Sequence, residues 1–410
     1  MQPEKQLAKW LDELGRVSDE EGKLTRTFLS PAMRRANRTV ATWMSAAGLA
    51  PREDAAGNLI GRLEGSTSKA KTLLLGSHLD TVRDAGRFDG AVGVLLPIAA
   101  LAELRRRKVK LPFAVEVLGF SEEEGVRFSS AYLGSKAFTG TLGSADLRLR
   151  DAQGISVREA LEHVNGRTFS LPRAAHHTKE LLGYLEVHIE QGPLLEAKQL
   201  AVGVVSGIAG QTRCELRFRG KAGHAGTTPM VLRRDALAGA AEFVTHVERV
   251  AQALEPLVAT VGTLTVRPGA PNVIPGEVVL SLDVRHPRDQ ARESALRDLV
   301  ARARVIAKGR GLALTSKIKQ QNGAVACSPL LKDLLDRSVQ KVQGRSLSLV
   351  SGAGHDAVVM SALTSIAMLF VRCREGLSHH PDEYASPADL RMALAVVVDF
   401  LERLAHRESL

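Results

Sequence analysis

Histidine and acidic residues stand where predicted strands give way to loops. His78 lies in GSHLDT, directly after an apolar strand predicted for residues 72–75. Asp89 lies between glycines in GRFDGAVGV, just before a predicted helix. The carboxyl edge of an α/β sheet, where His78 is expected, is the usual place of a functional site. Taken alone, however, His78 is more typical of a loop histidine, and Asp89 of a helix N-cap.

Three further motifs carry the same residue types. They add Glu122, Glu123 and Glu124 in SEEEGVRF, His188 in LEVHIEQGP, and His379 and His380 in GLSHHPDEY. Three adjacent carboxylates at the end of a buried strand repel one another unless cations neutralise them. A solvated acidic turn is the alternative for this run of glutamates.

Together these motifs predict a site for two divalent cations, such as zinc or manganese. Histidine and carboxylate side chains at strand-to-loop junctions are suitable ligands for such ions. One carboxylate can bridge two ions, which lower the pKa of water and so supply a nucleophile. A second, unligated carboxylate must then take and return a proton. The tandem Glu123–Glu124 offers candidates for both the base and a ligand.

The elements that must position these residues alternate between strand and helix in the first half of the chain. Apolar segments predict buried strands at 72–75, 113–119, 184–189 and 202–206, and residues 91–107 predict a helix. This alternation indicates an α/β domain with a largely parallel sheet.

The pattern changes after residue 210. Alternating polar and apolar residues predict half-exposed strands, and two longer segments predict helices. The predicted ranges are 213–220 (strand), about 233–254 (helix), 258–266 and 277–285 (strands), about 289–310 (helix) and 312–319 (strand). This order is typical of a ferredoxin-like α+β unit, a four-stranded sheet with two helices on one face. We therefore predict a catalytic domain formed by residues 1–209 and 325–410, interrupted by a lid at 210–324.

The composition argues against several other classes of protein. The 410 residues carry 55 basic and 45 acidic side chains, a formal net charge of +10. Nucleic-acid binding would require a basic stripe with interleaved aromatic residues, yet only 4% of the residues are aromatic and basic runs are short. The three cysteines are far apart and form no C-x-x-C pair, which disfavours a disulfide scaffold and fits a reducing cytoplasm.

No segment is typical of a membrane span or a signal peptide. Residues 90–104 form the most apolar stretch, but Pro97 interrupts it and it is too short to cross a bilayer. Four apolar residues between Leu7 and Leu14 share one helical stripe, which predicts a docked amphipathic helix. We expect a cytoplasmic protein without a membrane partner.

Eight motifs together resemble a known family. They are GSHLDT, GRFDGAVGV, SEEEGVRF, LEVHIEQGP, GKAGHAGTTPM, PNVIPG, SGAGHDA and GLSHHPDE. In order and spacing they resemble the dinuclear-metal amidohydrolases of the hydantoinase/carbamoylase family, over roughly residues 54–383. The resemblance implies an aminopeptidase-like metallohydrolase domain with an inserted ferredoxin-like lid and dimerisation domain.

The resemblance also implies metal-binding roles. By position, His78 and His188 match ligands of one ion, and Asp89 matches the carboxylate that bridges both. Glu124 and His379 match ligands of the second ion. His379 rather than His380 is assigned because it follows GLS directly, and a direct role for His380 stays open.

Catalytic and substrate-binding roles follow from the same resemblance. Glu123 matches the general base. His224, in GKAGHAGTTPM, matches a histidine that reaches the active site of the other subunit and polarises the scissile carbonyl. Asn272 and Arg285 match residues that hold the substrate carboxylate, and Gln211 matches another substrate contact. His355 and Asp356 in SGAGHDA receive no role.

The resemblance therefore implies a homodimeric hydrolase of ureido or carbamoyl C–N bonds in a small carboxylate substrate. One segment, MLFVRCREGLSHHPDE, favours allantoate. An N-carbamoyl-L-amino acid is the main alternative, followed by β-ureidopropionate or ureidoglycolate. A dipeptidase or aminoacylase on the same fold is less favoured, because IEQGP, GAGHDA and Arg285 resemble the ureido branch. A metal-binding regulatory protein without activity would be expected to lack a ligand or the base, and none is missing.

Overall fold

The computed structural model describes residues 3–67 and 70–408, and the chain divides into two compact units. The first unit combines Met1–Ser206 with Cys327–Leu410, and the second is Gly207–Ala326. The second unit is slightly wider than the insertion predicted at 210–324. In both units helices pack on mixed or antiparallel sheets, so the chain has a mixed α/β fold.

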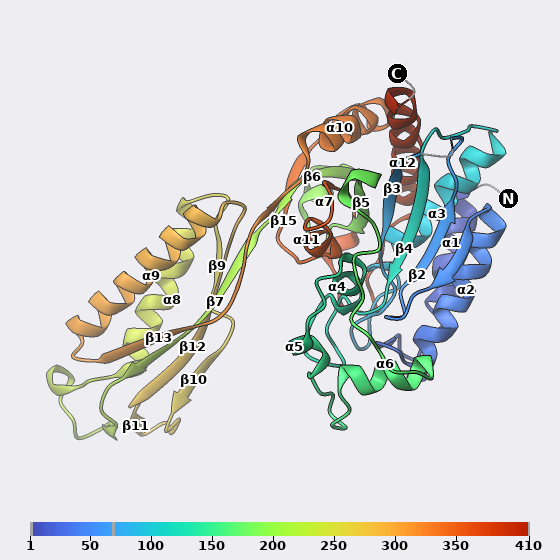
Figure 1. The fold of residues 1–410 in the computed structure, drawn as a ribbon. Helices are drawn as coiled ribbons and strands as arrows, with labels where there is room; N and C mark the ends of the chain where they lie inside the picture. The colour runs from blue at the N-terminus through green and yellow to red at the C-terminus, as the bar shows by residue number, and fades with distance from the viewer. Residues whose placement is uncertain (1–2, 68–69, 409–410) are drawn as a thin grey trace. The chain divides into compact units, whose positions relative to one another are not determined.

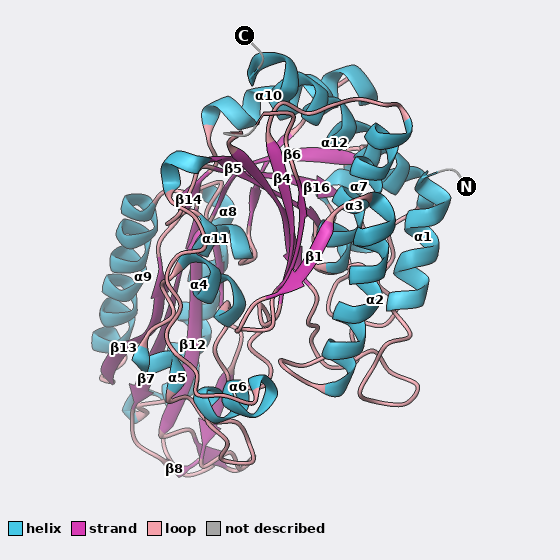
Figure 2. Ribbon diagram, turned by 45° about the vertical axis from the view of Figure 1, so that its right-hand side comes forward, coloured by secondary structure: helices cyan, strands magenta, loops and turns pink. Residues whose placement is uncertain are grey.

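A nine-stranded sheet forms the centre of the first unit (Figures 1 and 2). The strand order is β1-β2-β4-β3-β5-β16-β6-β14, and β15 also pairs with β6. The strands are β1 (Ala50–Glu53), β2 (Leu59–Leu63), β3 (Thr72–His78), β4 (Ala114–Phe120), β5 (Leu181–Ile189), β6 (Val202–Ile208), β14 (Val325–Ala326), β15 (Ser348–Ser351) and β16 (Ile366–Val371). The central strands β4, β3, β5 and β16 run parallel, whereas β1, β2, β6 and β14 pair antiparallel at the flanks. The predicted parallel arrangement therefore applies to the centre of the sheet, where the candidate residues lie.

Helices cover the sheet of the first unit. The longer ones are α1 (Pro3–Leu14), α2 (Pro31–Ala47), α3 (Ala91–Arg106), α10 (Pro329–Gln343) and α12 (Pro387–Glu408). The shorter ones are α4 (Leu133–Thr139), α5 (Ser144–Leu147), α6 (Val157–Asn165), α7 (Leu194–Ala197) and α11 (Asp356–Met360), with single turns η1 (Thr178–Glu180) and η3 (Arg374–Gly376).

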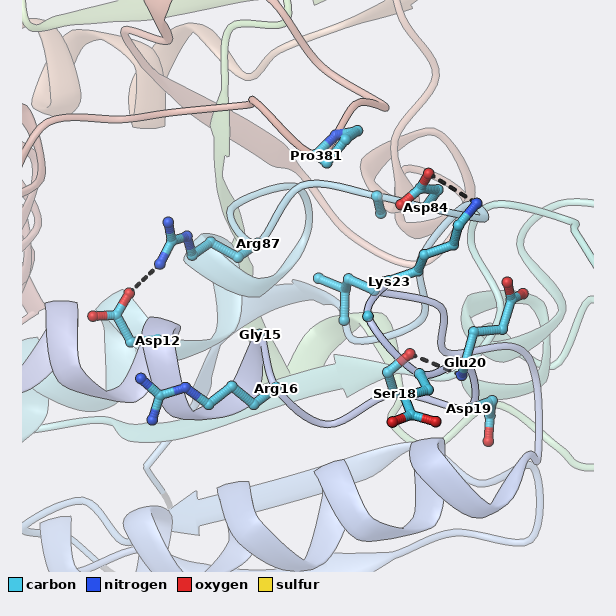
Figure 3. Close-up of a pocket in the computed structure, with 14 residues that line it drawn as sticks. Asp12, Gly15, Arg16, Ser18, Asp19, Glu20, Lys23, Asp84, Arg87 and Pro381 are labelled. Atoms are coloured by element: carbon cyan, nitrogen blue, oxygen red, sulfur yellow. Dashed lines mark hydrogen bonds and ion pairs between the residues drawn. The ribbon is translucent and has the colours of Figure 1, made fainter.

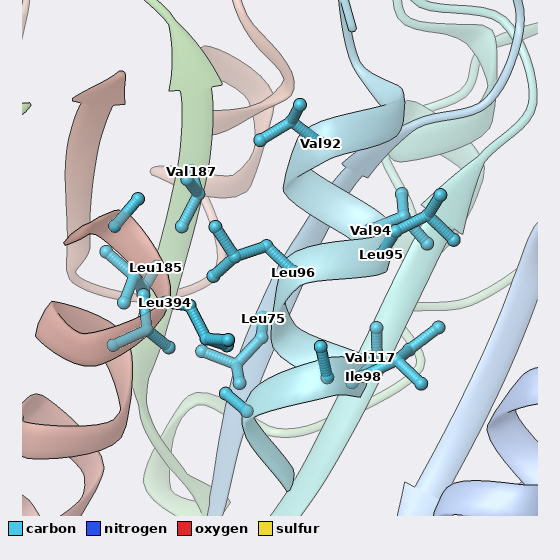
Figure 4. Packing of buried hydrophobic residues seen from close by; sticks show 14 of the residues in the cluster. Leu75, Val92, Val94, Leu95, Leu96, Ile98, Val117, Leu185, Val187 and Leu394 are labelled. Atoms are coloured by element: carbon cyan, nitrogen blue, oxygen red, sulfur yellow. The ribbon is translucent and has the colours of Figure 1, made fainter. Parts of the chain in front are cut away.

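Helix α3 is the centre of the main hydrophobic core. Its first eleven residues are all buried, between the sheet and helices α1, α2 and α12. Figure 4 shows Leu95, Leu96 and Ile98 of α3 among apolar side chains of β3, β4, β5 and α12. Each fully buried leucine stabilises the fold by roughly 2 kcal/mol. The segment just before α3, which carries Asp89, is therefore attached to a rigid element.

The main elements of the second unit follow the order strand, helix, three strands, helix, strand. Its main elements are β7 (Gly210–Arg219), α8 (Ala236–Ala253), β9 (Val258–Thr260), β10 (Leu264–Arg267), β12 (Glu277–His286), α9 (Asp289–Gly309) and β13 (Ala313–Asn322). A short pair, β8 (Gly223–His224) and β11 (Val273–Ile274), and the turn η2 (Met230–Leu232) complete it. The strands form a five-stranded antiparallel sheet in the order β10-β12-β7-β13, with β9 also on β12. Both helices pack on one face (Figure 1), as in ferredoxin-like units.

One predicted strand of this unit is divided in two. Residues 258–266 form β9 and β10, because regular pairing with β12 stops around Gly262. There the Ser281 hydroxyl accepts a hydrogen bond from the Thr263 backbone N–H at 3.0 Å. A side chain of β12 thus replaces a backbone partner at the break.

Two expectations about the chain as a whole concern cysteines and membranes. Cys214, Cys327 and Cys373 are free thiols, and all three are buried. Within residues 3–67 and 70–408, no helix has both the length and the apolar character that crossing a bilayer requires.

Candidate active site

The candidate metal ligands of the first unit lie at the carboxyl ends of its parallel strands. His78 is the last residue of β3, and His188 is the second-last residue of β5. Glu123 and Glu124 follow β4, and His379 follows β16. Because these four strands are neighbours and run parallel, their ends meet at one edge of the sheet. This topology brings residues that are far apart in sequence to one place.

Asp89 lies at the centre of this arrangement. Its Oδ1 is 3.0 Å from His188 Nε2 and 3.4 Å from His78 Nε2. Its Oδ2 is 3.3 Å from His379 Nε2, which is also 3.5 Å from Glu124 Oε1. The structure thus contains two three-residue groups that share Asp89, each with donor atoms within 4.8 Å of one another.

A glycine allows this close packing. Gly90 caps α3 with a positive φ of 64°, a conformation that favours glycine. A Cβ atom at this position would lie 2.4 Å from the His78 ring. The glycine after Asp89 is therefore required both by the backbone and by the imidazole beside it.

The donor atoms are suitably oriented for metal binding. His78 Nδ1 donates to the Asp80 backbone carbonyl at 3.0 Å, and His188 Nδ1 donates to the Ile189 carbonyl at 2.9 Å. These bonds fix the tautomer in which Nε2 carries the lone pair, and in both rings Nε2 faces Asp89. Imidazole and carboxylate donors of this kind fit zinc or manganese.

The charges around Asp89 are strongly coupled. Burial alone would favour protonated Asp89, but the imidazoles of His188, His379 and His78 hold its pKa well below the ordinary value. The hydrogen bond to Asp89 raises the pKa of His379 to about 9. Burial raises the pKa of Glu124 to about 7. A bound cation would stabilise the deprotonated form of all three groups.

Glu123 lies beside the two groups without contacting Asp89. One of its carboxylate oxygens lies within 4.8 Å of donor atoms of His78 and Glu124. Burial raises the pKa of Glu123 well above its ordinary value; His78 opposes this shift, and Glu124 adds to it. A carboxylate with a raised pKa, next to the two groups, is suited to accept and return protons.

Asp80 is a site residue that the sequence analysis missed. Its carboxylate accepts hydrogen bonds from the backbone N–H of Glu123 at 3.0 and 3.1 Å and from that of Glu124 at 3.1 Å. It is 1% exposed and lies two residues after His78. Asp80 therefore fixes the turn that carries both glutamates, and the H-x-D spacing in GSHLDT was the available signal.

Glu122 and His380, the neighbours of predicted site residues, point elsewhere. Glu122 Oε1 accepts from the Arg127 backbone N–H at 3.4 Å. His380 Nδ1 accepts from the Asp382 backbone N–H at 3.2 Å, within its own loop. His379 has a positive φ of 56°, and it is His379 whose ring contacts Asp89.

A third group, Glu186, His188 and His355, also has donor atoms within 4.8 Å of one another. The side chains of Glu186 and His355 already have hydrogen-bond partners within the protein. Glu186 accepts from Ser77 Oγ at 2.7 Å and from the Ala357 backbone N–H at 2.9 Å. His355 Nε2 lies 2.8 Å from Ser351 Oγ. We therefore interpret this group as a support behind His188 rather than as a third ion site.

In the second unit, Gln211 and Arg285 form one pair. They are opposite each other in the β7–β12 register. Both bind the Asp283 carboxylate: Gln211 Nε2 at 2.7 Å, and Arg285 through two bonds of 3.0 Å. Burial opposes the charge of Asp283, but Arg285 and Arg213 lower its pKa.

His224 and Asn272 form a second pair elsewhere in this unit. His224 pairs with Val273 in the β8–β11 register, and the Ala225 N–H donates to the Asn272 carbonyl at 2.9 Å. This pair lies beyond the Arg219 end of β7, whereas Gln211 lies at its start. The intervening strand spans about 25 Å at roughly 3.3 Å per residue. One copy of this unit therefore does not bring Arg285 and Asn272 together.

A cavity of about 680 Å³ in the first unit is lined by none of the candidate ligands (Figure 3). Its lining charges of opposite sign pair with one another, as Arg87 does with Asp12 and Lys23 with Asp84. Because these charges are already neutralised, we assign no ligand to the cavity.

Comparison with known proteins identifies similar proteins over nearly the whole chain. The model of Peptidase family M20/M25/M40 matches residues 74–403. The chain is 41% identical to allantoate deiminase 2 of Glycine max, covering 96% of this chain and 88% of that protein. It is 40% identical to an N-carbamoyl-L-amino acid amidohydrolase of Geobacillus stearothermophilus, covering 97% and 98% respectively.

Solved structures resemble this chain equally extensively. A hydantoinase/carbamoylase-family amidase from Burkholderia multivorans superimposes with a TM-score of 0.91 at 32% identity, covering 97% of both chains. The aminopeptidase PepT of Bacillus cereus, at 17% identity and a TM-score of 0.66, shares the fold alone.

Proposed function

Because the chain belongs to Peptidase family M20/M25/M40, and within it to the hydantoinase/carbamoylase group of amidohydrolases, we propose that it hydrolyses the ureido C–N bond of a small carboxylate. Allantoate is the first candidate substrate. An N-carbamoyl-L-amino acid is the alternative, because relatives named for the two substrates are 41% and 40% identical. The observation that carries the proposal is the pair of ligand groups sharing Asp89, with Glu123 beside them.

The proposed reaction consumes one water per ureido group. Water adds to the ureido carbon and one C–N bond breaks, which gives a carbamate. The remaining C–N bond of the carbamate then breaks, so that the final products are an amine, ammonia and carbon dioxide. This balance requires a group that removes a proton from water and a proton donor for the leaving nitrogen.

We infer that two divalent ions, zinc or manganese, act in this reaction. His78 and His188 would hold one ion and Glu124 and His379 the other, with Asp89 between them. When bound, the ions supply a water of lowered pKa and polarise the scissile carbonyl. The fixed tautomers of His78 and His188 support this assignment.

Glu123 is proposed as the group that moves protons. Its carboxylate would accept a proton from water and deliver it to the leaving nitrogen. Its nearly complete burial and raised pKa support this role, since a general base works best when its pKa approaches the working pH. Asp80 holds the Glu123 backbone in the required position.

The lid residues are proposed to bind the substrate carboxylate and carbonyl. Arg285 offers a planar guanidinium for paired hydrogen bonds to a carboxylate. His224 is proposed to stabilise the developing oxyanion. Asn272 and Gln211 would add neutral hydrogen bonds to the substrate.

We propose a homodimer in which the second unit is the lid and dimerisation domain. Gln211 and Arg285 lie at the start of β7, and His224 and Asn272 lie beyond its other end, a strand length of roughly 25 Å. This arrangement supports the assembly, since a small substrate cannot span a strand of that length within one lid. Each active site would then use Arg285 of its own chain together with His224 and Asn272 of a second copy.

An assay of ammonia release from ureido compounds, and of amino-acid release from a dipeptide, tests the substrate assignment. Metal-loaded protein is assayed with allantoate, ureidoglycolate, several N-carbamoyl-L-amino acids and a dipeptide, and kcat/KM is compared. The Glu123→Gln variant, purified identically, controls for contaminating enzymes. We expect a ureido compound to be the best substrate. Release of amino acids from the dipeptide as the fastest reaction would contradict the proposal.

A further inference from the structure

Three side chains without an assigned role surround the shared carboxylate of Asp89. Gln191 Nε2 donates to Asp89 Oδ2 at 2.8 Å. The Ser378 hydroxyl lies 2.7 Å from the same Oδ2 and 2.9 Å from Glu383 Oε2. Glu383 Oε1 accepts from the backbone N–H of Phe88 at 2.8 Å and of Asp89 at 3.0 Å. Glu383 thus holds the backbone at Asp89, while the other two hold its carboxylate.

The loop before Asp89 is shaped to receive Glu383. A Cβ atom on Gly86 would lie 2.3 Å from Glu383 Cβ, so this position admits only glycine beside the glutamate. Glu383 is 2% exposed, although it follows β16 and lies far from Asp89 in sequence. Its contacts therefore form a closely packed connection between the loop at 84–89 and the loop at 374–386.

The two carboxylate oxygens of Asp89 have different contacts. Oδ1 faces the His78 and His188 rings, and neither Gln191 nor Ser378 bonds to it. Oδ2 faces His379 and accepts from both Gln191 and Ser378. Rotation of the carboxylate about its Cβ–Cγ bond would break both bonds. Gln191 itself has a positive φ of 55°, an uncommon backbone state held by its surroundings.

We propose that Ser378 and Gln191, anchored by Glu383, are positioning residues that assign Asp89 Oδ2 to the His379 and Glu124 group. The inference rests on the proposed two-ion function and adds a division of roles to it. Binding of the ion held by Glu124 and His379 depends on the hydrogen bonds that Ser378 and Gln191 make to Asp89 Oδ2. Binding of the ion held by His78 and His188 depends on these hydrogen bonds much less, because backbone carbonyls fix its two histidines instead.

The test compares two serine variants. Ser378→Ala removes the hydroxyl that contacts Asp89 Oδ2, with almost no change in side-chain volume. Ser386→Ala is the matched control, because Ser386 Oγ also donates to a carboxylate, Asp389 Oδ2 at 2.6 Å, which belongs to neither ligand group. Chelator-stripped proteins are titrated with Mn²⁺ by calorimetry, bound metal is measured after dialysis, and thermal unfolding confirms that each variant folds.

We expect Ser378→Ala to weaken binding of one Mn²⁺ ion by about tenfold or more, the usual effect of losing a hydrogen bond to a ligand. The other ion should change by less than about threefold, and Ser378→Thr, which keeps the hydroxyl, should restore binding. In a His379→Ala background, which retains the first group, Ser378→Ala should have no further effect on the remaining ion. Ser386→Ala should bind both ions as the unmodified chain does, even if it melts earlier.

Normal binding of both ions by Ser378→Ala, or equal weakening of both, would overturn the proposed division. A wild-type chain that takes up fewer than two ions would instead contradict the proposed function, so the two failures are distinguishable.

Discussion

The two units hold their candidate residues in opposite ways. In the first unit, side chains from three strand ends and two loops converge on Asp89, and all of them except His379 are largely buried. In the second unit, four candidates form two pairs at opposite ends of β7, and His224 and Asn272 are exposed. One set is gathered in one place within its unit, and the other is divided between two places.

The difference follows from the two kinds of sheet. Parallel strands direct all their carboxyl ends to one edge, so the candidate metal ligands gather there within one chain. Antiparallel strands carry the loops of the second unit to both ends of the sheet. The proposed homodimer would bring the two pairs of the second unit together around one substrate. In this proposal the first unit provides reactivity, and the second provides recognition that depends on a partner copy.

The largest effect is expected in the first unit. Glu123→Gln should lower kcat by about 10³-fold, because the amide cannot accept and return a proton. Metal content and substrate affinity should stay close to normal. Steady-state kinetics with elemental analysis measures both. Glu122→Gln is the matched control, since burial raises the pKa of Glu122 and its carboxylate contacts the Arg127 backbone instead. Equal losses in the two variants would remove Glu123 from the proposed role.

The next effect concerns recognition by the second unit. Arg285→Gln should lower kcat/KM by about 10²-fold, mainly through KM, because paired hydrogen bonds to the substrate carboxylate are lost. Arg213→Gln is the control: Arg213 binds the same Asp283 carboxylate at 3.0 Å but is half exposed. Assays with a ureido substrate lacking the carboxylate should show little difference between Arg285→Gln and the unmodified chain. A large difference there would indicate a structural role for Arg285.

A smaller effect is expected for Asp80, which supports both glutamates. Asp80→Asn places an N–H donor against the Glu123 and Glu124 N–H groups, and activity should fall about tenfold. The same variant should bind metal more weakly, because Glu124 moves with Glu123. Kinetics at saturating and at limiting Mn²⁺ separates the two contributions. Unchanged activity at both metal concentrations would mean that the turn is held by other contacts.

Mixing two inactive variants tests the division between the units. His224→Ala and Glu123→Gln should each be nearly inactive alone. Random exchange of equal amounts puts about half of the molecules in mixed dimers with one intact site, so activity should approach about a quarter of the unmodified level. Native mass spectrometry verifies the exchange. No recovery after verified exchange, or an active monomer, would mean that each chain completes its own site.

The sequence predicts the convergence in the first unit well, because strand ends and residue types are both visible in it. It does not predict which atoms meet. His379 and His380 are identical neighbours, and only the loop conformation, with His379 at a φ of 56°, directs one of them to Asp89. Ser378 and Glu383 lie within a motif used for the resemblance, yet their importance comes from contacts across about 290 residues of chain.

In the second unit the sequence predicts the elements but not how far apart the candidate residues lie. Its main helices and strands are visible from alternation, but the division of residues 258–266 at Gly262 and the short pair β8 and β11 are not. The separation of Arg285 from Asn272 is not visible, because spacing along the chain does not reveal which end of a sheet a loop occupies. Register pairing, which depends on tertiary packing, decides that distance.

Two ions held around Asp89 are proposed to support ureido hydrolysis. The most direct test of this proposal is a titration in which chelator-stripped protein receives increasing Mn²⁺ or Zn²⁺, with bound metal and ammonia release measured in the same samples. We expect negligible activity without metal and maximal activity at about two ions per chain. Full activity in protein that retains only traces of metal would contradict the proposal.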